Sequence, residues 1–307
     1  MISAQNLSKY YDKIKALDNI SFEIKQGEVV GFLGPNGAGK TTLMKILTCY
    51  MPPTHGDVSI QNISIDKDSF SIRSNIGYLA EDNPLYLNMT VYNFLYYMAS
   101  LRSISPSEIT QKIINIIQLC DLETVQNMPI QHCSKGFRQR VGLAQALIHS
   151  PKVLILDEPT SGLDPNQIIE MRKLIKSLSK NTTVIICSHI LSEITATCDR
   201  VFILNKGNII LDSTIDALPS KNMFNIHVEI NANLNSLKDI LANLSDITSI
   251  KLLESDDEYN LFSISVQNDI REQLFSILTK KKYILKQFNL VETSLEDIFI
   301  SLTKDQK

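Results

Sequence analysis

Several features that would point to other classes of protein are missing from this chain of 307 residues. No apolar run approaches the roughly 18 to 20 residues that a helix needs to span a bilayer, and residues 1–6 carry no apolar segment of a secretory signal. The net charge of −3 leaves no basic excess of the kind that broad nucleic-acid binding requires. The five cysteines form no Cys-x-x-Cys pair, which argues against a disulfide framework or a zinc site. We therefore expect a cytosolic protein with reduced thiols and no nucleic-acid partner.

The composition is that of a folded protein with more than one domain. Apolar residues make up 44% of the chain and charged residues 21%, as in ordinary globular proteins. At about 100 to 200 residues per domain, the length favours two domains. We expect the first to span residues 1–217, with an inserted helical subdomain at about 88–150, and the second to span residues 221–307.

The most informative segment is residues 34–42, Gly-Pro-Asn-Gly-Ala-Gly-Lys-Thr-Thr, here called the phosphate loop. It fits the pattern G-x-x-x-x-G-K-[ST] and stands between an apolar run at 29–33 and a helix-like stretch at 43–47. Its glycines let the backbone wrap around phosphate groups, so that successive N–H groups face negative charge. The residues expected to bind nucleotide are Gly34, Asn36, Gly37, Gly39, Lys40, Thr41 and Thr42.

Two carboxylates follow an apolar strand further along the chain. Residues 153–156 are Val-Leu-Ile-Leu, and Asp157 and Glu158 come directly after them. We expect Asp157 and the Thr41 hydroxyl to hold magnesium, a hard cation that prefers oxygen ligands. Glu158 is expected to accept a proton from the water that attacks the γ-phosphate, or at least to orient this water. If neighbouring parallel strands end at one edge of the sheet, His189 lies beside these carboxylates and can donate to the γ-phosphate.

Local patterns before residue 150 predict strands and then helices. Alternating segments such as residues 20–24 indicate antiparallel strands, and the β pattern continues at 58–60 and 76–79. The pattern then becomes helical, with Ser105 as an expected N-cap and Glu108 as the residue that closes its capping box.

After residue 150 the pattern indicates a parallel sheet. Continuous apolar runs at 153–156 and 183–186 are typical of buried parallel strands, and a helix opening at residues 164–165 separates them. The first domain is therefore expected to be α/β, with a sheet covered on both faces. No phosphate loop, metal cluster or nucleophile is recognisable after residue 220, where we expect an accessory or regulatory domain.

That second domain shows the order βαββαβ, which matches a ferredoxin-like α+β sandwich. The strands are expected at residues 225–230, about 248–254, about 259–266 and 284–291. Helices are expected at residues 237–244 and 271–281, with a final short helix at 294–302.

In order and spacing these segments resemble the ATP-binding subunits of ABC transporters, over about residues 3–217. The residues from Ser161 to Asp164 look like that family's D-loop, and His189 looks like its switch histidine. Residues 76–81 look like the segment that carries the Q-loop, and residues 133–137 occupy the place of the LSGGQ sequence. The resemblance implies a P-loop NTPase core with an antiparallel β subdomain, ATP and Mg²⁺ as ligands, and ATP hydrolysis. It also implies that Tyr11 stacks on adenine, with Tyr10 as the alternative.

The chain departs from the family pattern at two places. Glu81 stands where most members have glutamine, so a carboxylate is expected to approach the magnesium and the attacking water. In the LSGGQ-like segment only Ser134 and Gly136 remain. The Ser134 hydroxyl, the Gly136 amide and the following helix start can still bind the γ-phosphate of a second subunit. Lys135 either adds positive charge there or is a solvated surface lysine.

The resemblance implies a head-to-tail homodimer in which ATP lies between one subunit's phosphate loop and residues 133–137 of the other, here called the Ser134 segment. Asp164 is also expected to bind the nucleotide in this dimer. It also implies a separate transmembrane permease, faced by residues 82–87, which would place the protein at the inner face of the cell membrane. Residues 81–86, 134–140 and 294–299 narrow the resemblance to ABC-2-type exporters, in particular their gliding-motility-associated subunit. The alternatives are a soluble ABC ATPase acting on ribosomes or DNA, and a module that binds ATP without hydrolysing it. The soluble ATPase lacks support, because such proteins usually carry two ATPase halves or a long coiled coil and this sequence has no repeat and no sustained heptads.

Overall fold

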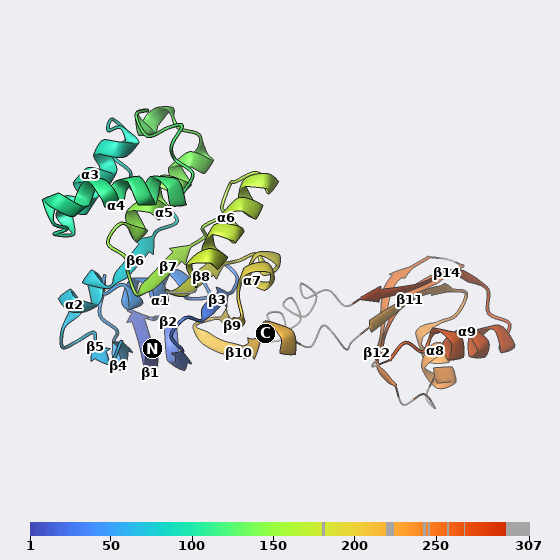
Figure 1. Ribbon diagram of the computed structural model, residues 1–307. Coiled ribbons are helices and arrows are strands. Elements are labelled where there is room, and N and C mark those ends of the chain that lie inside the picture. The colour runs from blue at the N-terminus through green and yellow to red at the C-terminus, as the bar shows by residue number, and fades with distance from the viewer. Residues whose placement is uncertain are drawn as a thin grey trace. The chain divides into compact units, whose positions relative to one another are not determined.

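A computed structural model describes residues 1–179, 182–218, 224–241, 244, 246–256, 258–266 and 268–292. The chain forms two compact units, Met1–Asp216 and Ala217–Lys307 (Figure 1). The helix predicted at residues 294–302 lies outside the described residues.

The first unit contains two sheets. A four-stranded antiparallel sheet has the order β2-β1-β4-β5, formed by β1 (Ile2–Tyr11), β2 (Ile14–Ile24), β4 (His55–Ile60) and β5 (Ile63–Ser64). A six-stranded sheet has the order β10-β9-β3-β8-β7-β6, formed by β3 (Val29–Leu33), β6 (Ile76–Leu79), β7 (Val153–Asp157), β8 (Thr183–Ser188), β9 (Arg200–Asn205) and β10 (Asn208–Thr214). Its strands are parallel except β10, which pairs with β9 antiparallel.

The helices of this unit lie between and around the sheets (Figure 1). They are α1 (Lys40–Leu47), α2 (Ser69–Ser74), α3 (Val91–Leu101), α4 (Pro106–Leu119), α5 (Lys135–Leu147), α6 (Pro165–Leu178) and α7 (Leu191–Thr197), with short 3₁₀ turns at Ile130–His132 and Ile215–Ala217. Helices α3, α4 and α5 form the predicted helical region. None of the described helices is long and apolar enough to cross a membrane.

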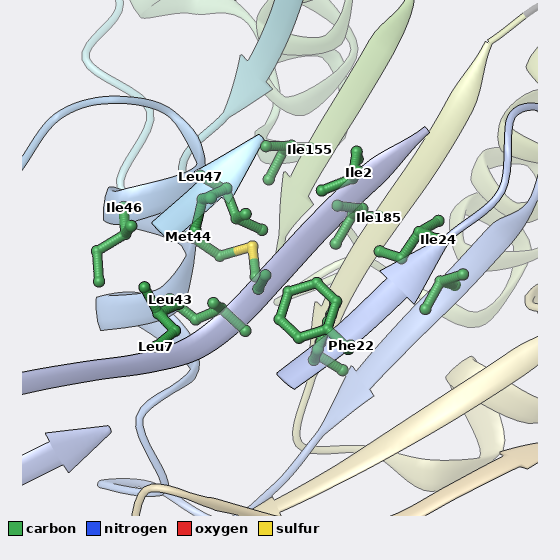
Figure 2. Packing of buried hydrophobic residues seen from close by; sticks show 14 of the residues in the cluster. Ile2, Leu7, Phe22, Ile24, Leu43, Met44, Ile46, Leu47, Ile155 and Ile185 are labelled. Atoms are coloured by element: carbon green, nitrogen blue, oxygen red, sulfur yellow. The ribbon is translucent and has the colours of Figure 1, made fainter. Parts of the chain in front are cut away.

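Alternation along the buried strands gives the six-stranded sheet two apolar faces. Phe32, Ile155 and Ile185 face the cluster that α1 and the antiparallel sheet complete. Figure 2 shows Met44 of α1 and Phe22 of β2 within this cluster. On the opposite face, α7 packs against β3 and β8, and α5 packs against the edge strand β6. The sheet is thus covered on both faces, as the uninterrupted apolar runs predicted.

The predicted start of α4 is confirmed, with Ser105 at the N-cap and Pro106 as the first helical residue, but the predicted capping box is wrong. Ser105 precedes α4, but its side chain makes no cap hydrogen bond, and its Oγ lies 2.8 Å from Ser107 Oγ instead. A nearby hydroxyl has therefore replaced the expected capping box. A complete capping box occurs at α6, where the Asp164 carboxylate accepts from the Gln167 amide at 2.9 Å.

The second unit is an antiparallel sheet with two helices. The elements follow as β11 (Phe224–Ile230), α8 (Leu234–Leu241), β12 (Ile247–Ser255), β13 (Asn260–Val266), α9 (Arg271–Lys280) and β14 (Leu285–Glu292), with the strand order β12-β13-β11-β14. Helix α8 begins at Leu234 and not at residue 237, because the Asn233 side chain accepts from the Ser236 amide at 2.8 Å and starts the helix earlier. Leu237 and Leu274 of the helices belong to the same apolar cluster as Val228.

A glycine on β3 lets α7 approach the sheet closely. A Cβ at Gly31 would lie 2.4 Å from Ile194 Cγ2 and 3.1 Å from Cys198 Sγ, both carried by the α7 segment. Such distances are shorter than packed atoms tolerate, so α7 can occupy this position only above a glycine.

We expect Gly31→Ala to lower the free energy of unfolding by about 1–3 kcal/mol, because the added methyl group overpacks the contact with α7. Urea titration of the full chain measures the loss. As a matched control, Ile194→Ala in the same background removes the clashing atoms, so the double variant should be less destabilised than the sum of the single changes. Additive losses would show that the contact does not limit packing.

Candidate active site

The phosphate loop, two carboxylates and a histidine meet at one edge of the six-stranded sheet. Strands β3, β8 and β7 are adjacent and parallel, and the register places Leu33 beside Ser188 and Asp157 beside Cys187. The residues that follow these positions therefore emerge together at the carboxyl edge. The order of the apolar strands in the sequence predicts this convergence, and the strand register contains it.

The backbone of the phosphate loop is open toward this edge. Gly37 has φ of 79° and no heavy atom within 4 Å of the position that a Cβ would occupy. Gly39 has φ of 107° and precedes α1 without a side chain that could cap it. The first-turn N–H groups of α1 have no intrahelical acceptor. They are positioned to receive an anion, and this fits a phosphate chain.

Lys40 brings a buried positive charge to the loop. Its side chain is 7% exposed, and its Nζ donates to the Gly34 carbonyl at 2.7 Å and to the Pro35 carbonyl at 3.2 Å. These acceptors are neutral carbonyls, so the charge of the ammonium group is not cancelled by them. Phosphate oxygens would offer a stronger, charge-assisted bond.

Glu158 and His189 are directly paired. Glu158 is 6% exposed and has φ of 49°, a strained conformation for a residue with a side chain. His189 Nδ1 lies 2.9 Å from Glu158 Oε1, and the His189 side chain is 51% exposed. An imidazole that donates from Nδ1 to this carboxylate can also donate from Nε2 only in its charged form.

Two further polar groups, which the sequence patterns did not indicate, belong to this network. Ser188 Oγ lies 2.9 Å from Glu193 Oε2 and 3.3 Å from Glu158 Oε2, and all three residues are buried. The one sequence signal is a carboxylate placed between the apolar residues Leu191 and Ile194 of a helix, where burial of the charge requires a partner.

Asp157 lies in an environment that a cation would relieve. Burial, together with the neighbouring carboxylates of Glu81 and Glu158, raises the pKa of Asp157 to about 6, while Lys40 and Lys45 act in the opposite direction. A divalent cation at this point would keep the carboxylate charged. The described residues contain no group of three or more His, Cys, Asp or Glu side chains that could hold a metal. A magnesium ion here would therefore take most of its ligands from phosphate oxygens and water.

Glu81 follows β6, the strand next to β7, and its side chain is exposed. Its charge is close enough to Asp157 to raise the pKa of that carboxyl. The approach of Glu81 to a bound magnesium stays a prediction.

The two tyrosines considered for adenine stacking differ in their surroundings. The Tyr10 hydroxyl donates to Asp18 at 3.1 Å, and its ring lies edge-on to His55. Tyr11 is 41% exposed at the end of β1, with Lys9 Nζ 5.6 Å from its ring centroid. Tyr11 therefore has the more accessible ring.

The Ser134 segment lies against the D-loop segment of the same chain. Ser134 caps α5 by accepting from the Phe137 amide at 3.3 Å. A Cβ at Gly162 would lie 1.9 Å from Lys135 Nζ, and one at Gly136 would lie 2.6 Å from Gln167 Oε1. No hydrogen bond or ion pair recorded within the described part of the chain joins this segment to the phosphate loop.

The fold and the site together define a P-loop ATPase. The family model described as "ABC transporter" matches residues 17–161. The bacitracin transport ATP-binding protein BcrA of Bacillus licheniformis is 33% identical over 98% of this chain and 97% of its own length. The lantibiotic transport ATP-binding protein SrtF of Streptococcus pyogenes is 38% identical over 70% of this chain and 92% of its own length.

Solved structures agree with these relatives. The ATP-binding cassette MJ0796, in a dimeric post-hydrolysis state bound to ADP and Pi, matches with a TM-score of 0.65 and 27% identity, over 70% of this chain and 99% of that one. CbiO1 of Clostridium perfringens, part of the ABC transporter complex cbiONQ, matches with a TM-score of 0.66 and 29% identity, over 79% of this chain and 95% of that one. The chain belongs to the ATP-binding proteins of ABC transporters, and it is an ABC-type ATPase that binds ATP.

Lys40→Ala should weaken ATP binding by at least about tenfold and reduce hydrolysis in parallel, because the loop loses its buried charge. Fluorescence titration with a labelled nucleotide measures the affinity. Lys25→Ala, an exposed lysine before β3, is the control and should bind ATP normally. Unchanged affinity in Lys40→Ala would contradict the assignment of the phosphate loop.

Proposed function

We propose that this chain is the ATP-hydrolysing motor subunit of an ABC-2-type exporter and drives a separate membrane permease. The observation that carries the proposal is the convergence of the phosphate loop, Asp157, Glu158 and His189 at one sheet edge. The roles of BcrA in bacitracin transport and of SrtF in lantibiotic transport support a transport function.

In the proposed reaction, water attacks the γ-phosphorus of ATP and the bond to the bridging oxygen of ADP breaks. Glu158 accepts the proton that the water loses, or orients the water for attack. His189 donates to the γ-phosphate, and the phosphate-loop amides and Lys40 hold the β- and γ-phosphates. Thr41 and Asp157, with Glu81 nearby, would hold Mg²⁺, which neutralises charge on the phosphates when bound.

The second half of the site would come from another copy of the chain. Ser134, Lys135, Gly136 and Asp164 are proposed to face the γ-phosphate of the partner subunit in a head-to-tail homodimer. The dimeric MJ0796 structures support this arrangement. ATP would then join the two subunits, and hydrolysis would release them, so that two arrangements alternate.

Glu158→Gln should keep ATP affinity but slow hydrolysis by about a hundredfold or more, because the amide does not accept the proton. With ATP and magnesium the variant should accumulate as a dimer, as measured by size-exclusion chromatography with light scattering. Glu123→Gln, which makes the same change at an exposed carboxylate, is the matched control. Normal turnover in Glu158→Gln would remove Glu158 from the mechanism.

We further propose that the permease docks in a groove beside α3. Two adjoining hollows of about 930 Å³ and 610 Å³ share Tyr78, Met98, Leu101 and Arg102 in their lining. Leu101 is 60% exposed, and Tyr86 at the smaller hollow is 52% exposed. An apolar segment with a carboxylate would complement this groove, which also contains the Arg102 guanidinium.

Leu101→Asp should prevent cross-linking to a polytopic membrane protein in ATP-supplied native membranes, because it adds a buried negative charge to the docked state. Mass spectrometry of the cross-linked products reads the result. Ile114→Asp, on α4 and 42% exposed, is the matched control and should leave cross-linking intact. Capture of ribosomal proteins or nucleic acid by the parent chain would instead support the soluble ATPase.

The remaining assignments follow from the same proposal. The first domain is assigned to residues 1–217, with the helical subdomain at about 88–150, and the accessory domain to residues 221–307. A ferredoxin-like fold of the accessory domain is supported by its element and strand order. The protein would act at the inner face of the cell membrane through the permease. A role in gliding motility rests on the sequence resemblance alone and stays a prediction.

A further inference from the structure

A buried hydroxyl group lies between two buried carboxylates next to the proposed catalytic pair. Ser188 is fully buried, and its Oγ is 2.9 Å from Glu193 Oε2 and 3.3 Å from Glu158 Oε2. The Ile190 amide donates to the same Oγ at 3.0 Å. One lone pair of the hydroxyl group is therefore already used, and its single hydrogen faces two acceptors.

The position of Glu193 is set by packing and not by the loop alone. Helix α7 is held on β3 by the contact between Gly31 and Ile194, and the Glu193 amide donates to the Ile190 carbonyl at 3.2 Å. Glu193 is 7% exposed, so its carboxylate has little access to water and needs a protein donor. Ser188 supplies that donor.

The ability of Glu158 to accept a proton depends on whether the Ser188 hydroxyl donates its hydrogen to Glu193 or to Glu158. Oε1 of Glu158 is engaged by His189 at 2.9 Å, and Oε2 has acceptor capacity for a water molecule. A hydrogen bond from Ser188 to Oε2 would compete with that water and make the carboxylate a weaker proton acceptor. The shorter distance from Ser188 to Glu193 indicates that the hydrogen is directed away from Glu158.

We propose that Glu193 is a positioning residue for ATP hydrolysis, which takes the Ser188 hydrogen and thereby keeps Oε2 of Glu158 available to the attacking water. This inference rests on the proposed role of Glu158. It assigns Glu193 no contact with ATP. A neutral glutamine at position 193 accepts hydrogen bonds more weakly than a carboxylate, so in Glu193→Gln the hydrogen would turn to Glu158.

A double-mutant cycle tests this inference, because the inference predicts that Ser188→Ala raises kcat in the Glu193→Gln background. We expect Glu193→Gln to lower kcat about tenfold while KM for ATP stays within about twofold. Adding Ser188→Ala removes the competing hydrogen, so the double variant should hydrolyse ATP faster than Glu193→Gln alone. A merely structural role of Glu193 predicts a double variant that is as slow or slower, and that result would overturn the inference.

Two controls separate the chemistry from folding. Glu272→Gln makes the same change in the first turn of α9, and Ser192→Ala changes the exposed neighbour of Glu193; both should keep the parent kcat. If Glu193→Gln does not fold, Ser188→Ala alone gives the answer. Its kcat should stay within about threefold of the parent, whereas a loss of about thirtyfold or more would show that Glu158 needs the hydrogen.

Glu158→Gln is assayed beside the cycle. Normal turnover in that variant would overturn both the proposed function of Glu158 and this inference. A stalled Glu158→Gln together with an unchanged kcat in Glu193→Gln would overturn the inference alone.

Discussion

The carboxylates of Glu81 and Glu158 act electrostatically on Asp157 at the carboxyl edge of the six-stranded sheet. Burial is the main reason that the pKa of Asp157 is raised, and the two neighbouring carboxylates add to the shift. A triphosphate adds further negative charge to this edge, so binding requires fixed positive groups in the same small volume. Lys40 and the uncapped amides of α1 supply them, because the loop places both above the end of β3.

The packing beneath this edge determines how closely those groups approach. Helix α1 is buried between the sheets by residues such as Leu43 and Met44, so the phosphate loop is attached to a rigid core (Figure 2). On the opposite face α7 packs closely against Gly31, and Glu193 of this helix accepts a hydrogen bond from Ser188. Tight packing on both faces gives the site little freedom to relax, which favours preorganisation.

The Ser134 segment contacts the segment that follows Glu158 in the sequence. Lys135 lies on Gly162 and Gly136 lies on Gln167, so the N-terminus of α5 rests on the segment that follows Glu158 in sequence. In the proposed dimer, the surface that serves the partner's nucleotide would therefore adjoin residues that follow the chain's own catalytic carboxylate.

Much of this protein was determined by patterns local in the sequence. The phosphate loop, the buried parallel strands and the start of α6 depend on neighbours within a few residues, so their residue types alone predict them. The placement of His189 beside Glu158 followed only from assuming that parallel strands end at a common edge. The network of Ser188, Glu193 and Glu158 was decided by tertiary structure, because the register of β7 and β8 joins groups about thirty residues apart. At Ser105 the local pattern predicted the N-cap position but not the hydrogen bond, because the Ser107 hydroxyl two residues away competes for the side chain.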